Sequence, residues 1–199
     1  QYHSILYFKN NMQIHEQLIF PNFFYTVHLE NINLSNLETF IKQKEQTDQG
    51  RQCSNIGGWQ QDIISDNNNT KTNLLDQCTD ICQEVCNSWK LDSEVIIKNA
   101  WANINRKHNL NFPHCHPKSI FSGIFYVRAH ADCGNLILKR PDIQEHYIDQ
   151  LNSEYTQKDF SIKPKTGMFV MFPAYISHYV EQSLTDNERI SVAINFDIK

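Results

Sequence analysis

The second half of this 199-residue chain is dominated by short segments that favour β-strands. Between residues 93 and 199 at least six segments are rich in β-branched and aromatic residues, and Pro, Gly, Asn or Asp separates them. In order, they read EVIIKNAWANI, SIFSGIFYVRA, GNLILKR, GMFVMFP, ISHYVEQ and RISVAINFDI. So many closely spaced strands predict a double-sheet sandwich or jelly roll.

Two helices are expected ahead of these strands. The first, over about 36–46, follows SNLE, in which Ser35 and Glu38 have the spacing of a capping box. The second, over 72–90, is amphipathic and should pack on a sheet, because its apolar residues recur with a period of 3.6. Its apolar face comprises Leu74, Leu75, Cys78, Ile81, Cys82, Val85, Cys86 and Trp89. Helices followed by many strands indicate an α+β fold, in which we expect the N-terminal helices to pack on the major sheet.

The length and the hydrophobic content of 40% suit one domain with a sizeable core. We expect a helix-rich N-terminal part over 1–92 and a β core over 93–199. The segment SNIGGWQQDIISDNNNT is rich in Gly and Asn, so it is predicted to be an irregular connection outside the core, with Trp59 as an anchor.

The charge pattern argues against nucleic acid and membranes as partners. The net charge is −4, with acidic and basic residues interspersed, so no basic stripe follows a phosphate backbone or an anionic membrane. No apolar run approaches the roughly 18 residues of a membrane-spanning helix, and the first residues lack the order of a signal peptide. We therefore expect a cytoplasmic protein.

The cysteines support the same compartment, because none of the six forms a CxxC pair. Cys78, Cys82 and Cys86 fall four residues apart in the second helix. They are either small hydrophobic residues on its buried face, which we favour, or zinc ligands.

Two histidines one residue apart precede the second strand, in NFPHCHPKSIFSGIFYV. On extended backbone His114 and His116 point to the same side and can converge on one metal ion. Pro113 and Pro117 favour extended backbone around them. The alternative is a pair of polar residues in a proline-flanked turn.

A third histidine strengthens the metal hypothesis. His178 lies between apolar neighbours in ISHYVEQ, and RISVAINF places Arg189 and Ser191 on one face of the last strand. A guanidinium in an apolar barrel needs a partner, and a ligand carboxylate fits its bidentate geometry.

The motifs HCHP, SIFSGIFYV, GNLIL, KPKTGMFVMFPAYISHYV and RISVAINF, in this order, resemble the Fe(II)- and 2-oxoglutarate-dependent dioxygenases. The resemblance is strongest to a small bacterial and phage branch that is similar to prolyl hydroxylases. With SNIGGWQQ and AWANIN it extends over about 54–196. It implies a double-stranded β-helix, a jelly-roll variant related to cupins, with a metal triad near one mouth of the barrel.

The same resemblance implies roles for individual residues. His114, His116 and His178 become the Fe(II) ligands, and Arg189 binds the distal carboxylate of 2-oxoglutarate with help from Ser191. Tyr126 contacts the same carboxylate, and Asn103 or Asn105 supplies another polar contact. The implied reaction uses O2 to hydroxylate a small-molecule or peptide substrate, with release of succinate and CO2.

The chain departs from the wider superfamily at His116, where H-x-D is usual. A neutral ligand leaves the site one unit more positive, which favours dianionic 2-oxoglutarate, weakens the hold on Fe(II) and leaves the native metal open. A literal H-x-D occurs at His130 and Asp132, but it follows the Tyr126 strand instead of preceding it. Strand order therefore favours His114 and His116, and a hairpin turn for His130 and Asp132.

Two other functions remain open at this point. One is a three-histidine, cupin-like metalloenzyme that does not use 2-oxoglutarate. The other is a jelly-roll binding module without catalysis.

Overall fold

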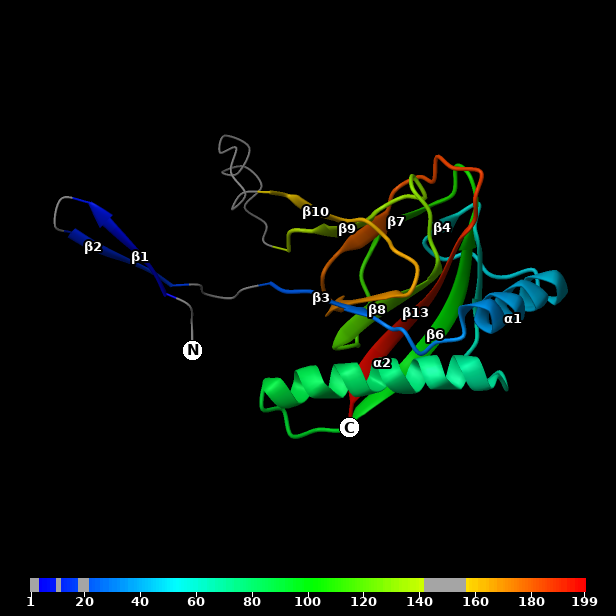
Figure 1. Ribbon diagram of the computed structural model, residues 1–199, viewed down its shortest axis with the longest axis horizontal. Coiled ribbons are helices and arrows are strands. Elements are labelled where there is room, and N and C mark those ends of the chain that lie inside the picture. Colours follow the sequence, from blue (N-terminus) through cyan, green and yellow to red (C-terminus); the bar gives the residue numbers. More distant parts are fainter. Residues whose placement is uncertain (1–3, 10–11, 18–21, 142–156) are drawn as a thin grey trace.

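Two antiparallel β-sheets and two helices make up the body of the protein in the computed structural model (Figure 1), which describes residues 4–9, 12–17, 22–141 and 157–199. The larger sheet has the strand order β3 (Tyr25–His28), β11 (Met168–Pro173), β8 (Phe121–Arg128), β13 (Arg189–Ile198), β6 (Val95–Asn105) and β5 (Trp59–Asp62). The smaller has the order β10 (Asp159–Ile162), β9 (Leu136–Lys139), β12 (His178–Val180), β7 (Leu110–His114) and β4 (Asn55–Ile56). Strands β1 (Ser4–Lys9) and β2 (Met12–Gln17) pair with each other.

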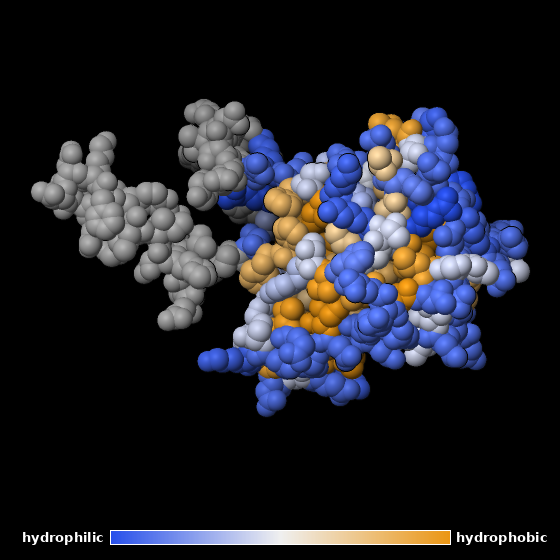
Figure 2. All heavy atoms as spheres, viewed as in Figure 1, coloured by the Kyte–Doolittle hydropathy of each residue, from blue (hydrophilic) through white to orange (hydrophobic). Residues whose placement is uncertain are grey.

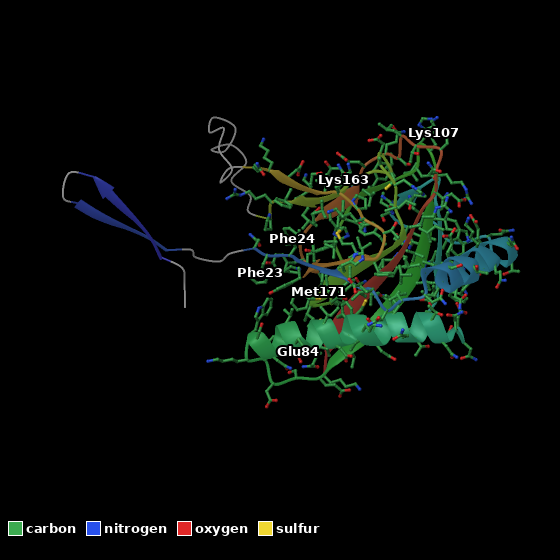
Figure 3. The ribbon with its side chains drawn as sticks, viewed as in Figure 1. Phe23, Phe24, Glu84, Lys107, Lys163 and Met171 are labelled. Atoms are coloured by element: carbon green, nitrogen blue, oxygen red, sulfur yellow. The ribbon has the colours of Figure 1, made fainter. Side chains whose placement is uncertain are left out.

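Both helices cover one face of the larger sheet, as predicted (Figure 1). Helix α1 (Leu34–Thr47) buries Leu37 and Ile41, and α2 (Asn69–Ser88) buries its apolar face against β6. In Figure 2 hydrophilic residues cover the outer side of α2, and hydrophobic residues gather where it meets the strands. Met171 of β11 belongs to this core and points toward α2 (Figure 3). Within the described part of the chain, no helix is long and apolar enough to cross a membrane.

The three cysteines of α2 are core residues. Cys78, Cys82 and Cys86 are fully buried in the cluster between the helices and the larger sheet. Burial raises the pKa of the Cys78 and Cys82 thiols, which keeps them protonated. All six cysteines are free, and these three belong to no metal-binding group among the described residues. The hydrophobic interpretation of these cysteines is confirmed.

Alternation of side chains over residues 99–105 of β6 and 189–195 of β13 separates the hydrophobic core from the interior of the barrel. Because side chains alternate across a strand, one face of each strand packs under the helices. That face carries Ala100, Ala102, Ile104, Ile190, Val192 and Ile194. The opposite face turns toward the smaller sheet and carries Asn99, Trp101, Asn103, Asn105, Arg189, Ser191, Ala193 and Asn195. The inner wall of the barrel on these strands is therefore mostly polar.

Two local predictions are wrong. Helix α1 is capped by Asn33, whose Oδ1 accepts from the Asn36 backbone N–H at 3.1 Å, so Ser35 lies inside the helix and forms no capping box. The Gly- and Asn-rich segment is not merely a connection outside the core, because β4 and β5 extend both sheets there. Trp59 and Ile63 are buried in the core, and Trp59 Nε1 donates to the Asp48 carbonyl at 2.9 Å.

Candidate metal centre and adjoining cavities

Three histidines converge at one end of the smaller sheet. His114 ends β7 and His178 begins β12, and the two are direct partners in the antiparallel register of these strands. His116 follows two residues after His114. The ring centroids lie 5.0 Å apart for His114 and His116, 4.4 Å for His114 and His178, and 5.1 Å for His116 and His178. One ring nitrogen from each lies within 4.8 Å of the other two, so the three could hold a metal ion together.

Backbone carbonyls orient two of the rings. His114 Nδ1 lies 2.7 Å from the Phe112 carbonyl oxygen, and His178 Nδ1 lies 3.0 Å from that of Ile176. Since a carbonyl can only accept, Nδ1 carries the proton in both rings and donates it. Nε2 is therefore left as the ligand atom, an arrangement common around metal-binding histidines.

Burial keeps all three imidazoles neutral. It lowers the pKa of His114, lowers that of His116 to about 4 and lowers that of His178 to about 3. The neighbouring histidines lower the pKa of His116 and His178 further. Neutral imidazole is the form that binds a transition metal, so no proton has to be displaced near neutral pH.

The literal H-x-D motif lies in a turn. His130 and Asp132 follow β8, and Asp132 adopts left-handed backbone with φ of 59°. His130 Nε2 accepts from Arg128 Nε at 3.1 Å, and neither residue joins a metal-binding group in the described part of the chain. The preference for His114 and His116, drawn from strand order, agrees with this geometry. His116 is held by its backbone N–H, which donates to the Ala174 carbonyl at 3.0 Å.

An inner cavity runs from the histidines into the barrel. Its polar lining includes Asn103, Asn105, Tyr126, Arg189 and Ser191, and its apolar lining includes Ile124, Val180 and Ala193. Tyr126, Ser191 and Asn103 form one row across β8, β13 and β6, because Ser191 is the register partner of both others. The predicted cosubstrate residues thus share this cavity with the three histidines.

Arg189 is a buried cation without an anionic partner in the described residues. Its Nη1 donates to the carbonyls of Cys133 and Gly134 at 3.3 and 3.1 Å, and its Nε has no hydrogen-bond partner in the described part of the chain. Burial lowers the pKa of its guanidinium, and it raises the pKa of the adjacent Tyr126 to about 12, which keeps that phenol a neutral donor. A buried, incompletely paired guanidinium calls for an anion.

A second cavity of about 510 Å³, the outer cleft, opens beside the histidines. It shares Ser54, Trp101, His114 and His116 with the inner cavity. The rest of its lining is Arg51, Cys53, Gln60, Asn99, Phe112, Pro113 and Asn195. Sequence reasoning missed this group, although polar residues at 99, 103 and 105 in an otherwise apolar strand were a usable signal, because asparagine is disfavoured in strands.

The two sheets form a double-stranded β-helix. Three converging imidazoles and a buried arginine in one of its cavities form a candidate metal centre. Residues 99–195 match the family model described as "Putative 2OG-Fe(II) oxygenase", and the chain belongs to this family. The matched segment contains His114, His116, His178 and Arg189. The family resemblance inferred from the sequence is confirmed.

Solved structures support the fold over nearly the whole chain. A prolyl-4-hydroxylase from Pseudomonas putida has a TM-score of 0.68 at 14% identity and covers 89% of this chain and 94% of its own. The viral collagen prolyl hydroxylase of Paramecium Bursaria Chlorella virus-1, in a 2-oxoglutarate complex, has a TM-score of 0.55 at 11% identity, with 87% and 94% covered. HygX from Streptomyces hygroscopicus, with nickel and 2-oxoglutarate bound, has a TM-score of 0.61 at 10% identity, with 88% and 83% covered. No curated protein matches the sequence.

Proposed function

We propose that the protein is an Fe(II)- and 2-oxoglutarate-dependent oxygenase that hydroxylates a small-molecule or peptide substrate and releases succinate and CO2. One observation carries the proposal. Three neutral histidines and an incompletely paired, buried arginine face the same cavity. The histidines suit a divalent metal ion, and the arginine suits the distal carboxylate of a dianionic cosubstrate.

The proposed roles follow from the positions of the side chains. His114, His116 and His178 hold the iron through Nε2 of the first and last rings and one ring nitrogen of His116. Arg189 pairs with the distal carboxylate of 2-oxoglutarate, while hydroxyl and amide groups complete the hydrogen bonds of that carboxylate. These groups are those of Ser191, Tyr126 and Asn103. Iron and 2-oxoglutarate, when bound, supply the oxidising chemistry that inserts an oxygen atom from O2 into the substrate.

The protein contributes charge balance and a dry environment. With three neutral ligands the Fe(II) site keeps its full positive charge, which complements a dianionic cosubstrate. Ile124, Val180 and Ala193 limit water around the reacting atoms. The strands β3, β4 and β5, which precede residue 93, complete both sheets and support one oxygenase domain from β3 onward.

Similar structures have been solved with both a small molecule and a peptide bound. HygX has been solved with hygromycin B bound, and a prolyl hydroxylase from Trichoplax adhaerens has been solved with a peptide of hypoxia inducible factor. Both are under 25% identical to this chain, so they support the breadth of the proposal and do not select a substrate.

The proposal is tested with purified protein loaded anaerobically with Fe(II). Addition of 2-oxoglutarate should change the absorption spectrum of the bound iron, and admission of O2 should yield succinate, slowly without a substrate. Glutarate, which lacks the keto group, is the matched control and should give neither signal. If 2-oxoglutarate leaves the spectrum unchanged and yields no succinate, the proposal is wrong.

A further inference from the structure

We infer that the outer cleft binds a small anionic molecule that carries a planar group and an N–H donor. The inference rests on the proposed function and narrows its substrate class. It concerns Arg51, Asn99 and Trp101, to which the family-derived site assigns no role.

The position and size of the cleft suit a small substrate. Its volume of about 510 Å³ lies within the range of small-molecule sites. His114, His116 and Trp101 line both this cleft and the inner cavity. A molecule in the cleft therefore lies next to the metal centre without having to displace the cosubstrate from Arg189.

The charges around the cleft favour an anion. Arg51 is exposed at the cleft, and no ion pair or side-chain hydrogen bond engages its guanidinium among the described residues. Among the residues that the structure describes, no Asp, Glu or Lys lines the cleft. His116, a neutral ligand where H-x-D would place a carboxylate, adds no negative charge. Local charge is thus positive although the whole chain carries −4.

A buried acceptor points to a hydrogen-bond donor on the same molecule. Asn99 Oδ1 is buried and has no hydrogen-bond partner among the residues that the structure describes. Its register partner on β13, Asn195, is satisfied, because Asn195 Oδ1 accepts from Ser122 Oγ at 2.9 Å. An unsatisfied buried acceptor costs free energy, so a ligand N–H that reaches Asn99 gains affinity and orientation.

Aromatic side chains provide the apolar contact. Trp101 lines both cavities, and its ring centroid lies 5.5 Å from that of His116. Phe112 is 56% exposed and also lines the cleft, next to Pro113. A flat group between such surfaces buries apolar area while the anionic end remains free to reach Arg51.

The test uses two probes that share a ring and an amide N–H and differ in whether the carboxyl group is charged. N-benzoylglycine combines a ring, an amide N–H and a carboxylate, and its methyl ester keeps the first two and removes the charge. Calorimetric titration is carried out on full-length protein loaded with Ni(II), in place of iron, and saturated with 2-oxoglutarate. The acid should bind in the millimolar range or tighter, and about fivefold tighter than the ester.

Three variants assign the contacts. Arg51→Gln should abolish the preference for the acid and leave ester binding unchanged. Asn99→Ala should weaken both probes, because both present the same N–H. Lys163→Gln changes the net charge equally at a residue outside the cleft lining (Figure 3), and should leave both affinities unchanged.

The outcomes separate this inference from the proposed function. Equal binding of acid and ester, no saturable binding of either, or a charge preference that survives Arg51→Gln would each overturn the inference. If 2-oxoglutarate still binds the Ni(II) protein in those cases, the proposed function stands. Failure of 2-oxoglutarate to bind would count against the proposed function itself.

Discussion

His114 and His178, 64 positions apart in the sequence, are direct cross-strand partners in the β7–β12 pair, and their ring centroids lie 4.4 Å apart. The backbone ladder between two strands therefore fixes the distance between two of the three candidate ligands. His116 lies beyond the end of β7, where it is held through the Ala174 carbonyl. The candidate metal centre is consequently built on rigid elements at two corners and on a short loop at the third.

Removal of any one of the three histidines should remove the metal. We expect less than one iron ion per protein chain in each of the variants His114→Ala, His116→Ala and His178→Ala, because two imidazoles cannot complete a facial triad. Elemental analysis after dialysis measures the content. His130→Ala is the matched control, since His130 pairs with Arg128 in a turn and should retain full metal. Metal content indifferent to all three changes would favour a binding module without catalysis.

His116→Asp should restore the usual carboxylate and reverse the charge effect. We expect tighter Fe(II) binding and weaker 2-oxoglutarate binding, each by roughly tenfold, because the added negative charge attracts the cation and repels the dianion. Both dissociation constants are measured by anaerobic titration. Changes of both affinities in the same direction would contradict the electrostatic explanation.

Arg189→Gln should separate cosubstrate binding from metal binding. Loss of a buried charged partner is expected to weaken 2-oxoglutarate by about 30-fold or more, while iron content stays unchanged. Arg106→Gln removes an exposed arginine paired with Glu45 and Glu188, and serves as the control. Unchanged 2-oxoglutarate affinity in the Arg189 variant would favour a three-histidine enzyme that uses another cosubstrate.

Acid should destabilise the metal-free protein through the buried histidines. The pKa of His116 falls from 6.5 to about 4 on folding, so the unfolded chain binds more protons between these pH values. The free energy of unfolding therefore decreases as the pH falls through this window. Urea denaturation in the presence of a chelator, at several pH values, should show a weaker dependence for His116→Gln than for wild type. Parallel pH curves would show that His116 is not buried as a neutral group.

Gly134→Ala should disrupt the loop that supports Arg189. Gly134 has φ of +85°, and a Cβ there would collide with the carbonyl of Glu181. Its own carbonyl accepts from Arg189 Nη1 at 3.1 Å. We expect a loss of stability of about 1–3 kcal/mol together with weaker 2-oxoglutarate binding. Asp132→Ala, also at a left-handed position in this turn, is a useful comparison because that residue has no contact with Arg189 among those described.

The candidate site was predictable where its signals were local. His114 and His116 are close in sequence, and the alternation of β13 places Arg189 and Ser191 on one face. His178 required the order of several motifs, since its pairing with β7 joins residues far apart in the chain. The hydrophobic period of α2 predicted most of its buried face, but Trp89, which was expected on that face, follows the end of the helix and is 39% exposed.

The outer cleft was not predictable for a physical reason. Its walls come from both sheets and therefore from residues far apart in the sequence. On the larger sheet, Gln60, Asn99 and Asn195 share the cleft only after the edge strand β5 has paired with β6 and β6 with β13. Strand propensity also misled, because the Gly- and Asn-rich segment looks irregular although β4 and β5 form within it. The N-cap of α1 was misplaced because Asn33 and Ser35 are both acceptable caps and only the backbone decides between them.

The alternation along β6 and β13 also limits how this protein can evolve. Loss or gain of one residue within either strand would exchange its two faces, so that arginine and asparagine would enter the helix-facing core and isoleucine would enter the barrel. Evolutionary changes within β6 and β13 must therefore occur mainly by substitution of residues. The bulge between Asn195 and Phe196 marks the one irregularity between these described strands, and we expect insertions and deletions within them to be tolerated best beside it.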